Sequence, residues 1–151
     1  MSEDNPIRVF VTHVFSDHSD YHRVFEYLES ASNFYYSNCS KPDDIPTTGG
    51  QEAIRDSLLE QIRGAEIVVI LSTMFSENQN LITFQMDAAQ AAEIPLIALE
   101  PFGGSGTLPA EVEARAAEVV GWNDRTMVDV IRREARHEDT QRWDVIEFDM
   151  S

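Results

Sequence analysis

Histidine and aspartate side chains form a dense group near the N-terminus, where they could bind a metal ion or contact a ligand. The group comprises His13, Asp17, His18, Asp20 and His22. Imidazole and carboxylate are common metal ligands, but Asp17, Ser19 and Asp20 also suit the cap of a helix that begins near Tyr21. No H-x-x-x-H pair lies wholly within that helix. We therefore expect capping residues on a solvated surface and no metal, with a ligand contact by His13 as a further alternative.

The order of predicted strands and helices decides where such side chains meet. Short β runs alternate with amphipathic windows, such as Tyr21, Val24 and Leu28 at helical spacing. The expected strands are residues 7–11, 34–36, 67–71, 95–99 and 118–120. Helices are expected around 21–28, 54–62 and 80–92, from Pro109 onward, and after a cap at Thr126. This alternation predicts an α/β fold: a three-layer, doubly wound parallel sheet of five strands in the flavodoxin-like order 2-1-3-4-5.

The chain has 151 residues, which is the usual length of one domain. We expect a single domain with a core over about residues 7–136. Residues 137–151 form a C-terminal tail, whose apolar positions between Trp143 and Phe148 could add an edge strand or pack as a lid. Hydrophobic residues make up 42% of the chain, and the apolar runs are far shorter than the ~18 residues of a transmembrane helix. The composition predicts a globular protein.

The charge balance is strongly acidic, with 27 Asp and Glu against 11 Lys and Arg and a formal net charge of −16. A surface of that sign repels phosphate backbones and anionic lipid, so neither nucleic acid nor a membrane is an expected partner. Lys41 is the single lysine. The scarcity of lysine and the acid excess together fit adaptation to a high-salt cytosol, whereas a GC-rich genome would also replace lysine by arginine.

Cysteine usage and the N-terminus both predict a cytoplasmic protein. Cys39 is the only cysteine, so no internal disulfide can form. Cys39 follows a short predicted strand, and the sequence offers no compelling partner base that could activate its thiol. We therefore expect an inert thiol. The first six residues are acidic and polar and lack the apolar stretch of a signal peptide.

The predicted topology places a ligand site beyond the carboxyl ends of the first and third strands. The strand order of a doubly wound sheet reverses between these two strands, and a crevice opens there. The site is therefore expected in residues 12–20 and 72–80, together with the start of the third helix.

Three known uses of such a site can be compared with these loops. The loop after the first strand reads Thr-His-Val-Phe-Ser-Asp and has no glycine, which excludes a dinucleotide fingerprint and a flavodoxin-type phosphate loop. A phospho-acceptor receiver needs an acidic pair after the first strand, an aspartate after the third and a lysine after the fifth. The corresponding positions are His13-Val14, Ser72-Thr73 and Gly121-Trp122, so this use is excluded too.

Four segments nevertheless resemble one family in their order and spacing. They are Phe10-Val11-Thr12-His13, Ala65 to Leu71 with Met74-Phe75, Pro95-Leu96-Ile97 with Pro101, and Val120-Gly121-Trp122-Asn123 followed by Val128 and Ile131-Arg132. Together they resemble the TIR-like domain family of the Thoeris antiphage defence proteins over about residues 7–136. The resemblance implies a flavodoxin-like TIR fold and NAD as substrate or ligand.

The resemblance also implies a chemistry. Family members cleave the bond between nicotinamide and ribose, and a carboxylate early in the third helix stabilises the resulting cation. The family pattern Trp-Ile-x-x-Glu-Ile falls on residues 81–86, so Gln85 stands in the place of the catalytic glutamate. Glu77, just before this helix, is the replacement candidate. The expected pocket lining consists of His13, Val14, Phe15, Ser72, Thr73, Met74 and Leu81.

Three roles for Gln85 remain open: an amide that satisfies backbone groups, a ribose contact, and catalysis with the help of Glu77. The corresponding functions are an NAD-cleaving or cyclising enzyme, whose diffusible product acts on an effector protein, and a catalytically silent module that binds NAD, a related adenine nucleotide or other proteins. The resemblance also allows a homo-oligomer through TIR surfaces. A phosphorylation-independent relative of receivers would rest on the fold alone.

Overall fold

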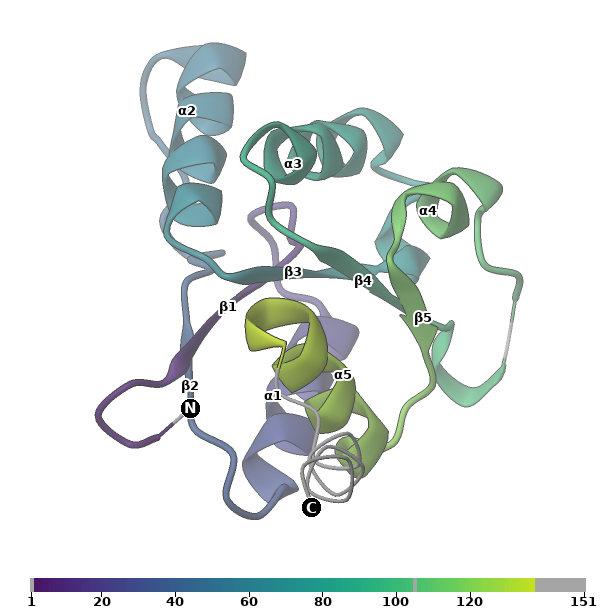
Figure 1. Ribbon diagram of the computed structural model, residues 1–151. Coiled ribbons are helices and arrows are strands. Elements are labelled where there is room, and N and C mark those ends of the chain that lie inside the picture. The colour runs from purple at the N-terminus through teal and green to yellow at the C-terminus, as the bar shows by residue number, and fades with distance from the viewer. Residues whose placement is uncertain (1, 105, 138–151) are drawn as a thin grey trace, which may run out of the picture.

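The computed structural model describes residues 2–104 and 106–137, which form an α/β domain around one parallel sheet (Figure 1). The five strands are β1 (Ile7–Val11), β2 (Tyr36–Asn38), β3 (Ile67–Leu71), β4 (Leu96–Leu99) and β5 (Glu118–Val120). Their order in the sheet is β2-β1-β3-β4-β5, and every neighbouring pair is parallel. The predicted topology is therefore confirmed.

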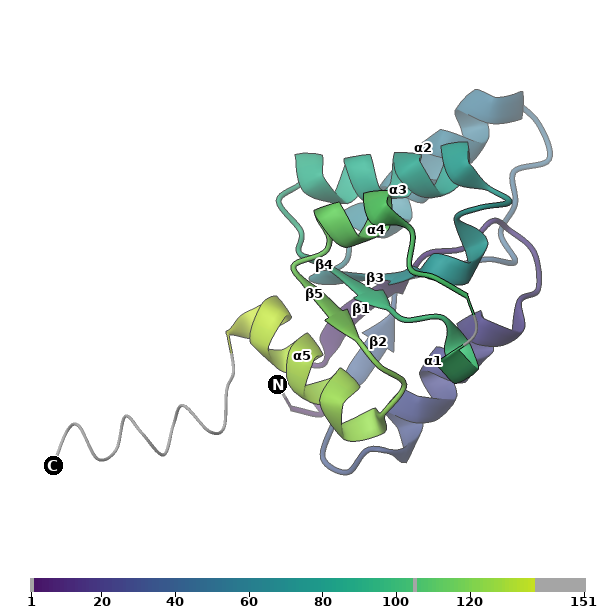
Figure 2. The same ribbon diagram turned by 90° about the vertical axis from the view of Figure 1, so that its right-hand side faces the viewer.

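Helices cover both faces of the sheet and make the three layers. On one face lie α2 (Gly50–Arg63), α3 (Gln79–Ala91) and α4 (Ala110–Arg115), and on the other lie α1 (Ser19–Ser30) and α5 (Asp124–Arg136), as Figures 1 and 2 show. Two short 3₁₀ turns, η1 (Ser72–Met74) and η2 (Phe102–Gly104), follow β3 and β4.

The core is centred on β3, whose five residues are all buried. A central parallel strand is covered on both faces, which explains its unbroken aliphatic run. From the helical layers, Val24, Leu58, Ile82 and Ile131 reach this core with at most 1% exposure. Each such side chain contributes about 1.5–3 kcal/mol when fully buried.

The bounds of β2 and the cap of α5 differ from the prediction. The second strand is Tyr36–Asn38 and not residues 34–36, because Tyr36 pairs with Ile7 while Phe34 packs into the core. The last helix is capped by Asn123, whose Oδ1 accepts from the Thr126 N–H at 3.0 Å. Thr126 therefore lies inside the first turn.

The cap of α1 is His18, whose Nδ1 accepts from the Asp20 N–H at 3.1 Å. The backbone of His18 is extended, which lets its side chain reach over the first turn as a capping residue does. Asp17 pairs with His22 instead. The histidine and aspartate group thus does serve as a helix cap, but through a different residue from the three predicted.

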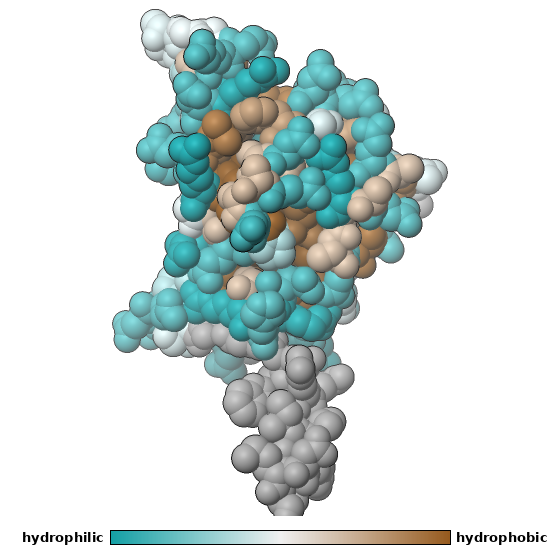
Figure 3. All heavy atoms as spheres, turned by 45° about the horizontal axis from the view of Figure 1, so that its top comes forward, coloured by the Kyte–Doolittle hydropathy of each residue, from teal (hydrophilic) through white to brown (hydrophobic). Residues whose placement is uncertain are grey.

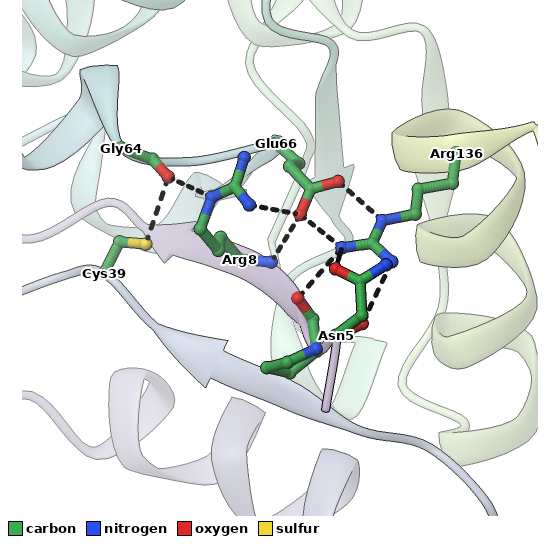
Figure 4. A network of polar contacts seen from close by, with 7 residues as sticks. Asn5, Arg8, Cys39, Gly64, Glu66 and Arg136 are labelled. Carbon is green, nitrogen blue, oxygen red and sulfur yellow. Dashed lines mark hydrogen bonds and ion pairs between the residues drawn. The ribbon is translucent and has the colours of Figure 1, made fainter. Parts of the chain in front are cut away.

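At the amino edge of the sheet, Glu66 ties α5 to the strands (Figure 4). Its carboxylate accepts from Arg136 Nε at 2.6 Å and Nη2 at 2.7 Å, and from the Arg8 backbone N–H at 3.1 Å. The Arg136 guanidinium also donates to the Asn5 and Pro6 carbonyls. These contacts lower the pKa of Glu66 below its usual value, chiefly through the Arg136 hydrogen bonds.

Within residues 2–104 and 106–137, no helix combines the length and the apolar character needed to cross a membrane. The predictions for a tail edge strand or lid concern residues 138–151, which lie outside the described residues.

Candidate functional site

The carboxyl ends of β1 and β3 are joined side by side, as the topology requires. The Thr12 N–H donates to the Val69 carbonyl at 3.0 Å, and the Thr12 hydroxyl oxygen accepts from the Leu71 N–H at 3.0 Å. The chain therefore leaves both strands at one edge, where the loop after β1, the η1 turn and the start of α3 come together. This is the edge at which doubly wound sheets bind their ligands.

Gln85 lies in the interior at this edge and is fully buried. Its Oε1 accepts from the His13 N–H at 3.2 Å, and its Nε2 donates to the His13 carbonyl at 2.8 Å and the Leu81 carbonyl at 3.2 Å. Both amide hydrogens are thus bound to backbone oxygens. These hydrogen bonds correspond to the first of the three roles left open by the sequence, an amide that satisfies backbone groups.

The His13 ring is also buried and fully hydrogen-bonded. Its Nδ1 accepts from the Phe15 N–H at 3.2 Å, and its Nε2 lies 2.8 Å from Oε1 of Gln61 on α2. Burial lowers the pKa of His13 below its usual value, although the Gln61 hydrogen bond and the charge of Asp43 act in the opposite direction. The imidazole is therefore neutral at pH 7.

Val14 and Phe15 are half-buried and follow His13 into the loop. Phe15 has a φ of 58°, a left-handed conformation that is uncommon outside glycine. Its ring meets the His13 ring edge-on, with centroids 4.7 Å apart. The contacts of His13 therefore hold this loop in a defined, strained shape.

The polar side chains after β3 are bound within the protein. The Ser72 hydroxyl donates to the Leu99 carbonyl at 2.9 Å, and the Thr73 hydroxyl donates to Oδ2 of Asp20 at 2.8 Å. Met74 is buried. The structure thus gives these three predicted pocket residues internal partners or core positions.

A hollow of about 630 Å³ opens beside them, between the start of α2 and the segment that leads into α3. Its lining consists of Gln51, Ile54, Arg55, Ser76, Glu77, Asn78, Gln79, Asn80 and Leu81. Figure 3 brings the face with α2, α3 and α4 forward and shows apolar surface between polar ridges. Ile54, Leu81 and Phe84 are half-buried apolar residues of α2 and α3.

Of the nine predicted site residues, the hollow brings together Glu77 and Leu81. Glu77 is exposed, and the Arg55 guanidinium in the same lining lies 5.5 Å from the centre of the Phe84 ring. A carboxylate, a guanidinium and apolar walls can together hold a polar organic ligand that carries phosphate.

Site residues of α2 were missed from the sequence: Gln51, Ile54 and Arg55, which line the hollow, and Gln61, which contacts His13. Gln61 follows Leu58 by three residues and precedes Ile62, so it is a polar residue on the apolar stripe of α2. A polar residue on a buried stripe indicates an internal hydrogen bond, because a buried amide needs hydrogen-bond partners. The position of Gln61 was therefore a signal that the sequence offered. Arg55 gave no such signal, because an arginine on a helix surface is ordinary.

Cys39 lines a smaller hollow of about 350 Å³ near Lys41 and Gln61. Its thiol lies 3.6 Å from the Gly64 carbonyl, and burial raises the pKa of Cys39 above its usual value. The sulfur is therefore a protonated thiol at neutral pH and a poor nucleophile.

The strand order, the helical layers and the site at the carboxyl edge define a flavodoxin-like domain of the TIR type. The family model described as "Thoeris protein ThsB, TIR-like domain" matches residues 10–104, which is more than half of the chain. The chain belongs to this family. The match ends before residues 120–132, so it is shorter than the extent of 7–136 suggested by the resemblance.

A solved structure, described as a conserved protein from Enterococcus faecalis V583, has the same fold. Its TM-score to this chain is 0.61 at 10% sequence identity, and the alignment covers 85% of this chain and 99% of that one. At this identity the likeness concerns the fold alone. No curated protein matches the chain.

Proposed function

We propose that this TIR-like domain of antiphage defence binds NAD or a related adenine nucleotide in the hollow between α2 and α3. The observation that carries the proposal is the hollow itself, which lies at the switch-point edge and has the volume of ordinary small-molecule sites. Arg55 supplies a fork of N–H donors for phosphate. Ile54 and Leu81 supply apolar walls.

The proposed role is binding without rapid cleavage of the glycosidic bond. Departure of nicotinamide leaves a cationic ribose, which a carboxylate stabilises and a neutral amide does not. Gln85 is neutral, buried and engaged with the backbone of His13 and Leu81. Loss of one such electrostatic stabiliser costs about 2.7–4 kcal/mol, or about 10²–10³ in rate.

Calorimetric titration with NAD tests the binding. Arg55→Gln should weaken NAD affinity at least about tenfold, because a charge-assisted contact to phosphate is lost. Arg63→Gln is the matched control, since Arg63 is exposed at the other end of the same helix. Absence of NAD and ADP-ribose binding, or equal effects of the two substitutions, would overturn the proposal.

A second candidate is NAD cleavage by Glu77, favoured by the exposed carboxylate in the same hollow as Arg55. In that case the product, ADP-ribose or a cyclic isomer, would act on an effector protein, and assembly through TIR surfaces would accompany activity. Nicotinamide release should then fall about 10²–10³-fold in Glu77→Gln. Glu93→Gln, at an exposed position after α3, is the control.

The two candidate functions predict different results when nicotinamide release is measured with and without phage lysate and in molar salt. Binding without nicotinamide release supports the silent module. Release that disappears in Glu77→Gln supports the enzyme, and release that persists in this variant excludes Glu77.

A further inference from the structure

We infer that Gln61 is a positioning residue for the proposed nucleotide site, because with His13 and Gln85 it forms a buried polar bridge between α2 and α3. These two helices are the walls of the hollow: α2 carries Ile54 and Arg55. The inference rests on the proposed function only in its last step, the effect on ligand affinity.

The direction of each hydrogen bond in the bridge follows from backbone groups that can only donate. The Phe15 N–H donates to Nδ1 of His13 at 3.2 Å, so that nitrogen carries no proton. The Lys41 N–H donates to Oε1 of Gln61 at 2.8 Å, so this atom is the amide oxygen. The 2.8 Å contact between His13 Nε2 and Gln61 Oε1 is therefore an Nε2–H donation. Gln61 thus fixes the tautomer of His13.

The other end of the bridge reaches α3. Gln85 holds the backbone of His13 by its N–H and its carbonyl, and donates a further hydrogen bond to the carbonyl of Leu81. Leu81 lines the hollow. His13 is consequently fixed to α2 through its ring and to α3 through its backbone, and its position sets how far apart the two walls stand.

The tautomer also decides the shape of the loop. Only an unprotonated Nδ1 accepts from the Phe15 N–H, and this bond holds Phe15 at a φ of 58°. Loss of the Gln61 acceptor would let the proton move to Nδ1, and the Phe15 N–H would lose its partner. Gln61 therefore acts on the loop and the hollow through His13, without touching the ligand.

Nuclear magnetic resonance of the full chain tests this directly. In Gln61→Leu, the ring ¹⁵N signals of His13 should shift from those of the pure Nε2–H tautomer to those of a mixture of the Nε2–H and Nδ1–H tautomers. Hydrogen exchange of the Phe15 amide with solvent should accelerate at least about tenfold. The amides of β3 should stay protected, and NAD affinity should fall about tenfold. Gln90→Leu is the matched control, because Gln90 is exposed on α3.

Gln61→Glu is the conservative variant and keeps an acceptor for both His13 and Lys41. It should retain the Nε2–H tautomer and the slow Phe15 exchange while raising the pKa of His13, since a carboxylate then faces the ring together with Asp43. If Gln61→Leu does not fold, the His13 pKa in Gln61→Glu still tests whether Gln61 contacts the His13 ring. An unchanged His13 pKa in Gln61→Glu, or an unchanged tautomer in a folded Gln61→Leu, would overturn the inference.

The two proposals fail in different ways. If the native protein binds no adenine nucleotide, the proposed function is lost, but the tautomer and amide-exchange results still decide the role of Gln61. If NAD binds and Gln61→Leu changes the loop without changing affinity, the proposed function stands and the positioning role is excluded.

Discussion

The side-chain amide of Gln85 pairs with the backbone of His13 as a neighbouring strand would. It accepts from the His13 N–H at 3.2 Å and donates to the His13 carbonyl at 2.8 Å. The hydrogen bonding of the sheet thereby continues past the end of β1, with one helical side chain as the partner. An amide offers a donor and an acceptor at once, which an ionised carboxylate does not.

Gln85→Glu should therefore destabilise the fold at neutral pH. A buried carboxylate would face the carbonyls of His13 and Leu81, both acceptors, so it would bind a proton and its pKa would be raised. The expected loss is about 1–3 kcal/mol at pH 7. The loss should shrink toward pH 4, where the unfolded glutamate is protonated too. Urea unfolding across this range measures it.

Gln90→Glu provides the control for this pH dependence, because Gln90 is exposed on the same helix. It should change the free energy of unfolding by less than about 0.5 kcal/mol. If Gln85→Glu were as stable as the native protein at pH 7 and released nicotinamide, the amide would not be a structural requirement.

His13 should make stability pH-dependent in the range below its ordinary pKa. Burial lowers its pKa in the folded protein, so below about pH 6.5 the unfolded chain binds a proton that the folded chain does not. Stability is then lost as the pH falls from 6.5 toward the folded pKa, by up to about 1.4 kcal/mol per pH unit.

The comparison protein for this prediction is His13→Gln, which keeps a polar side chain without a titrating ring. Both proteins contain every other ionisable group, so the difference between their stability curves isolates His13. Urea midpoints between pH 5 and 8 should converge as the pH falls. Parallel curves would show that His13 keeps its ordinary pKa.

The sheet order was predictable from the sequence because it follows from coarse features. The aliphatic run of β3 and the helical stripe with Leu58 and Ile62 are set by burial, which repeats with the period of each element. Of the two short edge strands, β5 matches its predicted residues 118–120, whereas β2 was less predictable. In β2, Tyr36 had to be chosen over Phe34 by pairing with Ile7, a contact between distant parts of the chain.

The candidate site was predictable in its place but not in its side-chain contacts. Topology put residues 12–20 and 72–80 at one edge, yet it could not show that the Thr73 hydroxyl serves Asp20 or that Gln85 turns inward. Such choices depend on which backbone groups lack partners at a strand end. A single sequence does not encode that in its spacing. Gln61 is different, because its place on the apolar stripe of α2 was a signal in the sequence.

Glu66 should stabilise the protein through its ion pair with Arg136. Glu66→Gln keeps the shape but removes the charge, and should cost about 1–3 kcal/mol at pH 7. The Arg136 contacts lower the pKa of Glu66, so the contribution is present above about pH 4.5 and is lost as the pH falls through the depressed value. Urea unfolding at pH 7 and pH 3 measures both effects.

Glu93→Gln is the control for this pair, because Glu93 is exposed at the end of α3. Its stability should stay close to that of the native protein at both pH values. A Glu66→Gln protein that is equally stable at pH 7 would mean that the network in Figure 4 adds no net free energy.

Thr73→Val distinguishes a structural hydroxyl from a ligand contact. The Thr73 hydroxyl donates to Asp20, which also pairs with Arg23, so its loss should cost about 1–2 kcal/mol of stability. NAD affinity should change less than about twofold, because the hydroxyl already has a partner. Thermal unfolding and calorimetry check the two parts. Unchanged stability with lost binding would make Thr73 a nucleotide contact, as the sequence predicted.

Salt should stabilise this protein if its net charge of −16 reflects a high-salt cytosol. Repulsion among carboxylates opposes the compact state, and the screening length falls from about 10 Å at 0.1 M to about 3 Å at 1 M. The free energy of unfolding should therefore rise by at least about 1 kcal/mol between 0.1 and 2 M KCl.

A charge variant separates this effect from a general action of salt on protein surfaces. Glu26, Glu52 and Glu113 are exposed, and their joint replacement by glutamine reduces the repulsion. The triple variant should be more stable than the native protein at low salt and should gain less from KCl, since less repulsion remains to be screened. Equal gains in both proteins would assign the effect to KCl itself. Cooperative folding in dilute buffer with no gain in either protein would leave genome composition as the reason for the scarcity of lysine.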